Sequence, residues 1–133
     1  MRYILDTNIL AHLVRRPQGA VWEHIARVGE ERVCTSIVVA AELRFGAIKS
    51  GSERLSKHVD AILEALDILP LEPPADTIYG TLRWRLERLG LPIGANDLLI
   101  AAQASSYGHT LVTDNEREFG RIEELALENW LRP

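Results

Sequence analysis

The sequence predicts an α/β fold with three layers (α/β/α), in which helices cover both faces of a central parallel sheet of four to five short strands. Short, wholly apolar runs alternate with segments in which apolar residues recur every three or four positions, a pattern typical of parallel β-α units. The clearest run is Tyr3–Leu5, which stops at Asp6. The length of 133 residues predicts a single domain, residues 1–133, with a core of its own.

The first half of the chain is expected to supply three helices and a second strand. Two short helices should follow Asp6, with a break at Pro17–Gly19 and a stop near Gly29. A strand is expected at residues 32–35, and Ser36 is a good N-cap for a helix over residues 36–50. The core-facing residues expected in that helix share a helical spacing and are Val38, Ala41, Phe45 and Ile48.

The second half is expected to add further helices and the remaining strands. A helix at 52–66 should form a hairpin with the one before it, and a strand is expected at 68–71. Residues 97–104 are apolar almost all round, which predicts a central buried helix. A strand at 110–113 runs into another acid, and a last strand is expected near Leu127, with Trp130 closing the core. Between these segments, Pro73–Pro74 opens a helix whose expected inward residues are Ile78, Leu82, Leu86 and Leu89.

Four acids occupy settings that favour a shared site. Asp6 and Asp114 follow strands, Asp97 opens the buried helix, and Glu42 lies at the edge of the expected core face of helix 36–50. Because the carboxyl ends of parallel strands meet at one edge of a sheet, these side chains are expected to converge.

Closely packed carboxylates raise each other's pKa, and a divalent cation relieves the repulsion. Carboxylate and water oxygens suit Mg²⁺, with Mn²⁺ as a substitute. The sequence therefore predicts catalytic, metal-binding residues in a set that comprises Asp6, Glu42, Asp97 and Asp114. A carboxylate-held Mg²⁺ in turn predicts phosphodiester chemistry.

Each acid also has a plain structural explanation when it is taken alone. Asp6 and Asp97 could simply cap helices, where a carboxylate is favoured. Glu42 could extend to solvent or pair with Arg44 or Arg2. The recurrence of acids at comparable junctions favours the metal interpretation over the separate explanations.

Composition excludes several classes of protein. The net charge of -4 gives no overall basic signature for nucleic acid, although 13 Arg against 2 Lys leave room for a local phosphate-binding patch. The single Cys34 allows no internal disulfide, and the four His show no zinc spacing. No P-loop motif is present. An acid at position 6 argues against a signal peptide, no apolar run approaches the ~20 residues of a membrane helix, and a cytoplasmic location is expected.

Blocks of sequence in a fixed order make the chain similar to a known family over nearly its whole length. The chain resembles the PIN-domain ribonucleases, and specifically the VapC toxins of bacterial type II toxin–antitoxin modules. The resemblance rests on Leu5-Asp6-Thr7-Asn8-Ile9-Leu10, Thr35-Ser36-Ile37, Glu42-Leu43 with Gly46-Ala47, Gly90-Leu91-Pro92-Ile93-Gly94-Ala95-Asn96-Asp97, Leu99-Ile100-Ala101-Ala102, Leu111-Val112-Thr113-Asp114-Asn115, Arg117-Glu118-Phe119 and Leu127-Glu128-Asn129-Trp130.

The resemblance implies a PIN-like fold in which Asp6, Glu42 and Asp97 surround Mg²⁺. The fourth acid is less regular, because many relatives read Thr-Asn-Asn where this chain has Thr113-Asp114-Asn115. Gln103 stands where relatives often carry His, and Ala95 stands where many have Pro. Neither departure changes one of the carboxylates. The resemblance also implies a metal-dependent endoribonuclease that cuts tRNA and inhibits translation.

The same resemblance implies partners. These are a VapB-type antitoxin whose C-terminal tail covers the acidic pocket, an RNA substrate, a second copy of the toxin, and operator DNA reached through the antitoxin. The dimer surface is expected on helix 52–66, on helix 73–90 or on both. Basic residues that flank the predicted acids are expected to contact RNA phosphate, namely Arg15, Arg16, Arg44 and Lys49.

Three other functions remain open from the sequence. A housekeeping PIN nuclease would share every catalytic acid. A non-catalytic PIN module would bind RNA or a partner without cutting, which retention of the acids argues against. A phosphatase of the haloacid-dehalogenase type also places an Asp after its first strand, but it needs a second Asp at the position of Asn8.

Overall fold

The strands form one parallel sheet. A computed structural model describes residues 1–132. The sheet has the strand order β3-β2-β1-β4-β5, and all four neighbouring pairs are parallel. The expected parallel sheet is therefore confirmed, and its strands are β1 (Tyr3–Leu5), β2 (Val33–Ser36), β3 (Asp67–Leu69), β4 (Thr110–Val112) and β5 (Leu127–Glu128).

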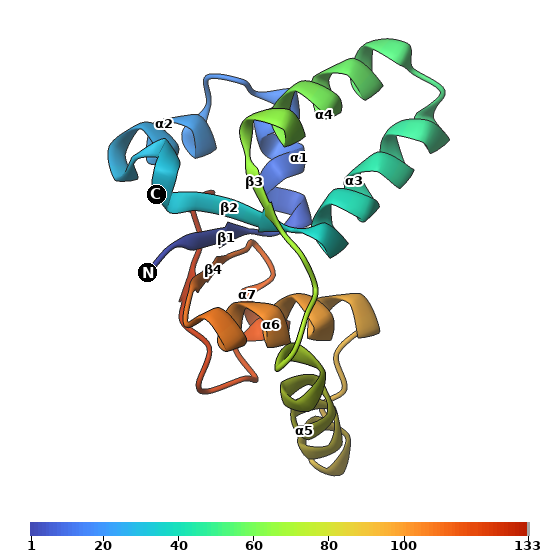
Figure 1. The fold of residues 1–133 in the computed structure, drawn as a ribbon, viewed down its shortest axis with the longest axis vertical. Coiled ribbons are helices and arrows are strands. Elements are labelled where there is room, and N and C mark those ends of the chain that lie inside the picture. Colours follow the sequence, from blue (N-terminus) through green and yellow to red (C-terminus); the bar gives the residue numbers. More distant parts are fainter. Residues whose placement is uncertain (133) are drawn as a thin grey trace.

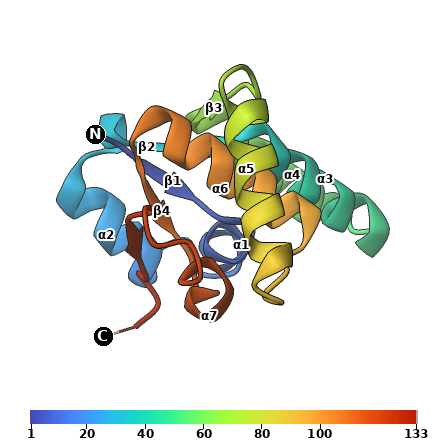
Figure 2. The same cartoon turned by 90° about the horizontal axis from the view of Figure 1, so that it is seen from below.

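Helices cover both faces of this sheet, as Figures 1 and 2 show. The group on one side comprises α1 (Thr7–Arg15), α2 (Ala20–Val28), α3 (Ile37–Ser50) and α4 (Glu53–Ala65). The other side carries α5 (Ala75–Arg88) and α6 (Ala95–Tyr107). The short elements η1 (Glu30–Arg32) and α7 (Glu116–Phe119) complete the described chain. The expected three-layer arrangement is confirmed.

The core lies between the layers and includes the central strands. Every residue of β1, β2 and β4 is buried, as expected for strands with helices on both faces. Helix α6 buries six of its thirteen residues, so the predicted central helix is also confirmed. Trp130 is buried as expected, and its ring lies against Tyr3 and stacks on His24.

The pairing of β1 with β4 fixes the place of the candidate site. Moving out from β1, the chain continues to β2 and β3 on one side and to β4 and β5 on the other. Open α/β sheets place their ligand sites at the carboxyl ends of strands where the order reverses in this way. The backbone N–H of Asp6 donates to the carbonyl of Val112 at 2.9 Å. Asp6 and Thr113, the residues that follow β1 and β4, are thereby held side by side.

The expected core face of helix 36–50 is wrong. Phe45 and Ile48 are 66% and 76% exposed. The residues of α3 that are buried instead are Val39, Ala40, Leu43 and Ala47. The helix carries apolar residues on nearly all sides, so periodicity alone could not select the inward face. The face is set by tertiary packing, because α3 and α4 form a hairpin that contacts α1.

The expected inward position of Leu89 is also wrong. Leu89 is 64% exposed, because α5 ends one residue earlier and Leu89 only caps it.

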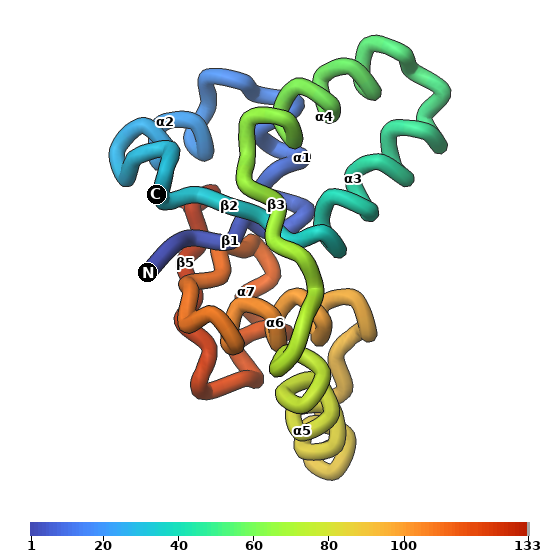
Figure 3. Tube along the Cα trace, viewed as in Figure 1, coloured from blue at the N-terminus to red at the C-terminus, as the bar shows by residue number. Residues whose placement is uncertain are grey.

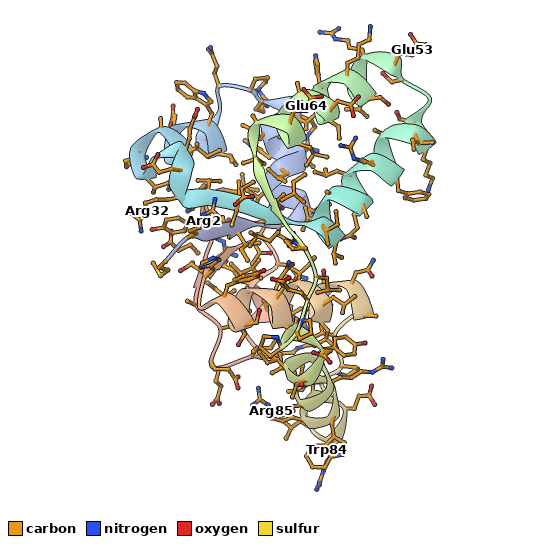
Figure 4. All side chains as sticks on the ribbon, in the orientation of Figure 1. Arg2, Arg32, Glu53, Glu64, Trp84 and Arg85 are labelled. Carbon is orange, nitrogen blue, oxygen red and sulfur yellow. The ribbon has the colours of Figure 1, made fainter. Side chains whose placement is uncertain are left out.

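The trace in Figure 3 shows the α3–α4 hairpin extending away from the sheet. Its tip is marked by Glu53 in Figure 4, whereas Trp84 marks the far end of α5. The carboxyl edge of the sheet lies between these two projecting parts.

Candidate active site

Asp6 is the most firmly held acid of the site. It directly follows β1 and caps α1, and it is buried with only 4% exposure. Its Oδ1 accepts from the backbone N–H of Thr7 and its Oδ2 accepts from the hydroxyl of Thr113, both at 2.8 Å. Burial raises the pKa of Asp6, and these two hydrogen bonds offset part of that rise. Both carboxylate oxygens thus have fixed directions.

Asp97 lies in the first turn of α6, as the sequence predicts. Its pKa is raised from 3.8 to about 6, first because the carboxyl is partly removed from water. The charges of Asp6, Glu118 and Glu42, together with an interaction with the Glu118 side chain, raise it further. These causes place the four carboxyl groups in one neighbourhood.

Glu42 joins this group from α3. Its Oε1 accepts a hydrogen bond from the hydroxyl of Thr7 at 3.0 Å, so the residue after Asp6 orients a second acid. Glu42 and Asp97 line one open hollow of about 380 Å³, together with Gly94, Ala95 and Asn96. The two acids therefore border a space that is open to solvent and large enough for a phosphodiester group.

The structure does not bring Asp114 into this group. Asp114 is exposed, and its Oδ1 accepts from the side-chain amide of Asn129 at 3.0 Å. Its charge is not among those that raise the pKa of Asp97. Because the chain turns after β4, Thr113 points to Asp6 and Asp114 points away. The fourth acid of the group is Glu118, one turn further along in α7.

Sequence reasoning missed Glu118 although a signal was present. Glu118 lies in the polar run Glu116-Arg117-Glu118, and a helix of one turn has no periodicity that would mark an inward face. The signal was the pair of polar residues Thr113 and Asn115 directly upstream. Side chains that can donate hydrogen bonds often accompany metal-binding carboxylates and orient them.

The acidic cluster, defined as Asp6, Glu42, Asp97 and Glu118, has no cationic partner within residues 1–132. The ion pairs there use other acids, namely Asp67, Asp60, Glu87, Glu124 and Glu116. The donors that do reach the cluster are neutral hydroxyl and amide groups. Uncompensated negative charge at a half-buried site is costly and is typical of a cation site.

The donor set fits a hard divalent cation with an open ligand shell. The cluster consists only of carboxylate oxygens, which suit Mg²⁺ and Mn²⁺ and disfavour zinc. Within residues 1–132 no three His, Cys, Asp or Glu side chains are gathered closely enough to enclose a metal ion. Mg²⁺ normally keeps several water ligands and needs only one or two carboxylates directly, so this ion does not require three carboxylates at bonding distance.

A family model and close relatives identify the fold. The model described as "PIN domain" matches residues 3–125. The chain belongs to the PIN domain family.

Individual relatives are similar over nearly the whole chain. The chain is 39% identical over 132 residues to "Ribonuclease VapC2" of Rickettsia felis, covering 98% of each chain. It is 34% identical to "tRNA(fMet)-specific endonuclease VapC" of Shigella flexneri, again over 98% of each. Among solved structures it is similar to VapBC2 of Rickettsia felis bound to a promoter DNA fragment, with a TM-score of 0.91, 38% identity and coverage of 98% of this chain and 99% of that one.

These relatives confirm the resemblance to VapC-type PIN nucleases and the expectation that this chain is an enzyme of the nuclease class. In the part of the chain that the structure describes, no helix is long and apolar enough to cross a membrane.

The raised pKa of Asp97 predicts a pH-dependent stability. Because its folded pKa of about 6 exceeds its unfolded value, the folded protein binds more protons between about pH 4 and pH 6, and stability falls as pH rises through that range. Asp97→Asn removes the charge but keeps the size. In EDTA at pH 7.5 we expect this variant to melt higher than the wild type, on the order of 5 °C, with the difference lost near pH 4. Differential scanning calorimetry measures both.

Asp76 provides a matched control for this prediction. It is an exposed Asp in the first turn of α5, so Asp76→Asn changes a helix-start carboxylate outside the cluster. This variant should gain nothing at either pH. Equal melting temperatures of the wild type and Asp97→Asn at pH 7.5 would contradict the repulsion described above.

The placement of the fourth acid can also be tested directly. Glu118→Gln should lower kcat/KM for RNA cleavage about tenfold or more, because it removes a carboxylate of the cluster. Asp114→Asn should stay within about threefold of the wild type, because Asp114 lies outside the cluster. Steady-state cleavage of a fluorescent RNA measures both variants. The reverse order of effects would restore Asp114 as the fourth site residue.

Proposed function

We propose that this chain is the toxin of a VapBC-type module and acts as a Mg²⁺-dependent endoribonuclease that cleaves tRNA. The observation that carries the proposal is the acidic cluster, which lies at the β1–β4 edge of a PIN fold and has no cationic partner among residues 1–132. The family and the ribonuclease relatives support the enzyme class. The name of the Shigella flexneri relative, a tRNA(fMet)-specific endonuclease, supports tRNA as the substrate class.

The residues of the cluster would have different roles in such a reaction. When bound, Mg²⁺ or Mn²⁺ supplies positive charge for the phosphodiester and lowers the pKa of water. Asp6 is the anchored acid, since both of its oxygens accept hydrogen bonds within the fold. Glu42 and Asp97 border the open hollow, where a scissile phosphate would enter. The carboxylates must be ionised to hold the ion, so metal binding should strengthen as pH rises through about 6.

A mostly apolar groove between α1 and the α3–α4 hairpin contains one basic residue that could meet RNA. The polar or charged residues of its lining are Thr7, Glu42 and Arg15. Arg44, in contrast, forms an ion pair with Asp60 at 2.6 Å, and Lys49 lies over the ring of Phe45. Among the basic residues expected to contact phosphate, Arg15 therefore has the most direct structural support.

Partners of two kinds belong to the proposal. The solved relative VapBC2 of Rickettsia felis is a complex bound to promoter DNA, which supports a VapB-type antitoxin for this chain. A homodimer is supported by the α3 apolar face, defined as Ile37, Phe45 and Ile48, which are 46%, 66% and 76% exposed. Contiguous apolar surface of this kind is typical of an interface. Of the two helices expected to form the dimer surface, α5 exposes an aromatic side chain, Trp84, whereas α4 exposes mainly charged residues. The exposed residues of α5 therefore suit an interface better than those of α4.

The catalytic proposal predicts a metal requirement. The antitoxin-free protein should cleave total tRNA with Mg²⁺ or Mn²⁺ and should lose cleavage in EDTA. Asp97→Asn should lower the rate at least about 100-fold, because a metal supplies several kcal/mol of transition-state stabilisation. Asp76→Asn is the control and should cleave like the wild type. The measurement is a time course on denaturing gels.

Other outcomes of that experiment would contradict the proposal. Equal cleavage by the wild type and Asp97→Asn would indicate another site or a contaminating nuclease. No cleavage of tRNA or of other cellular RNA by the wild type would favour the non-catalytic PIN module. Cleavage of RNA precursors with tRNA left intact would favour the housekeeping nuclease.

The dimer proposal predicts the effect of a charge on the α3 apolar face. Phe45→Glu should convert the protein from twice the mass of one chain to a single chain in multi-angle light scattering, because a buried unpaired carboxylate is costly. Trp22→Glu changes an exposed aromatic residue on α2 and should leave the mass unchanged. A Phe45→Glu protein that keeps the dimer mass would exclude this face as the interface.

A further inference from the structure

Asn115 makes two contacts that converge on the acidic cluster. It lies in the turn between β4 and α7. Its side-chain amide Nδ2 donates to Oε2 of Glu118 at 3.1 Å. Its backbone N–H donates to the hydroxyl oxygen of Thr113 at 3.0 Å. The turn therefore contacts the cluster through one side chain and one backbone group.

The backbone contact is compatible with donation from the Thr113 hydroxyl to Asp6. A hydroxyl group has one proton to donate. The Asn115 N–H already donates to the Thr113 oxygen, so the proton of that hydroxyl is free for Oδ2 of Asp6, 2.8 Å away. The chain of contacts thus runs from Asn115 through Thr113 to Asp6, and separately from the Asn115 amide to Glu118.

Helix capping does not explain the Asn115 side chain. Asn115 precedes α7, and Asn is a favoured N-cap residue. Yet its side chain accepts no capping hydrogen bond from the helix backbone. The amide is directed instead to Glu118, an acid that has no ion-pair partner within residues 1–132.

We propose that Asn115 is a positioning residue whose side-chain amide orients the Glu118 carboxylate toward the cation held by the acidic cluster. This inference rests on the proposed metal-dependent function. A neutral amide suits the task, because it fixes one oxygen of Glu118 without cancelling the negative charge that the cation requires. An Arg or Lys at this position would form an ion pair and compete with the metal.

The C-terminal segment supplies a natural control. The amide of Asn129 donates to Asp114 Oδ1 at 3.0 Å and to Glu116 Oε2 at 3.2 Å. Asn129 therefore braces the same turn without contacting any acid of the cluster. Asn129→Ala and Asn115→Ala both remove amide hydrogen bonds from this turn, but only Asn115→Ala releases a cluster carboxylate.

The test is Mn²⁺ binding to the antitoxin-free protein, measured by isothermal titration calorimetry without RNA. Asn115→Ala keeps the backbone N–H, so the link to Thr113 and Asp6 remains and only the contact with Glu118 is lost. We expect Asn115→Ala to weaken Mn²⁺ binding about tenfold, within the range measured for residues that orient metal ligands. Asn129→Ala should lower the melting temperature at least as much, but leave Mn²⁺ affinity within about twofold.

A double-mutant cycle shows whether Asn115 acts through Glu118. Glu118→Ala should weaken Mn²⁺ binding at least as much as Asn115→Ala, and the double variant should bind like Glu118→Ala alone. Additive losses, or an unchanged affinity of Asn115→Ala, would overturn the inference while the proposed function stands. A wild type that neither binds Mn²⁺ nor cleaves RNA would overturn both.

Discussion

The parallel pairing of β1 with β4 is the constraint on which the rest of the site depends. This pairing holds Asp6 beside Thr113 through the hydrogen bond from the Asp6 N–H to Val112. The sheet reverses its strand order at that point, so the carboxyl ends of both strands open onto a shared edge. Helices α3 and α6 then bring Glu42 and Asp97 to the same edge. The local turns then adjust only the orientation of side chains whose positions this strand pair has fixed.

Most of the fold and three members of the acidic cluster could be predicted from the sequence. Apolar runs that stop at a polar residue identified β1, β2 and β4, and Asp6 and Asp97 sit at junctions whose position follows from those runs. Glu42 was selected for its position beside an apolar stripe, and that stripe proved to be the exposed face of α3. Glu42 nevertheless reaches the cluster, where its carboxylate accepts a hydrogen bond from the Thr7 hydroxyl.

The remaining features depend on tertiary packing, which the local sequence does not determine. Whether Asp114 or Glu118 faces the cluster is decided by how the chain turns after β4. The inward face of α3 is decided by its packing against α4 and α1, since apolar residues occur on several sides of the helix. In both places the local sequence is compatible with more than one orientation.

The uncompensated charge of the acidic cluster also bears on the lifetime of the protein. A ligand that binds only the folded state lowers the population of unfolded chains in proportion to its concentration over its dissociation constant. On the proposed metal site, free Mg²⁺ would therefore protect the chain from proteases that attack transiently unfolded molecules. A shortage of Mg²⁺ would both inactivate the nuclease and speed its degradation. The cellular abundance of the protein and its catalytic activity would then depend on the same ion.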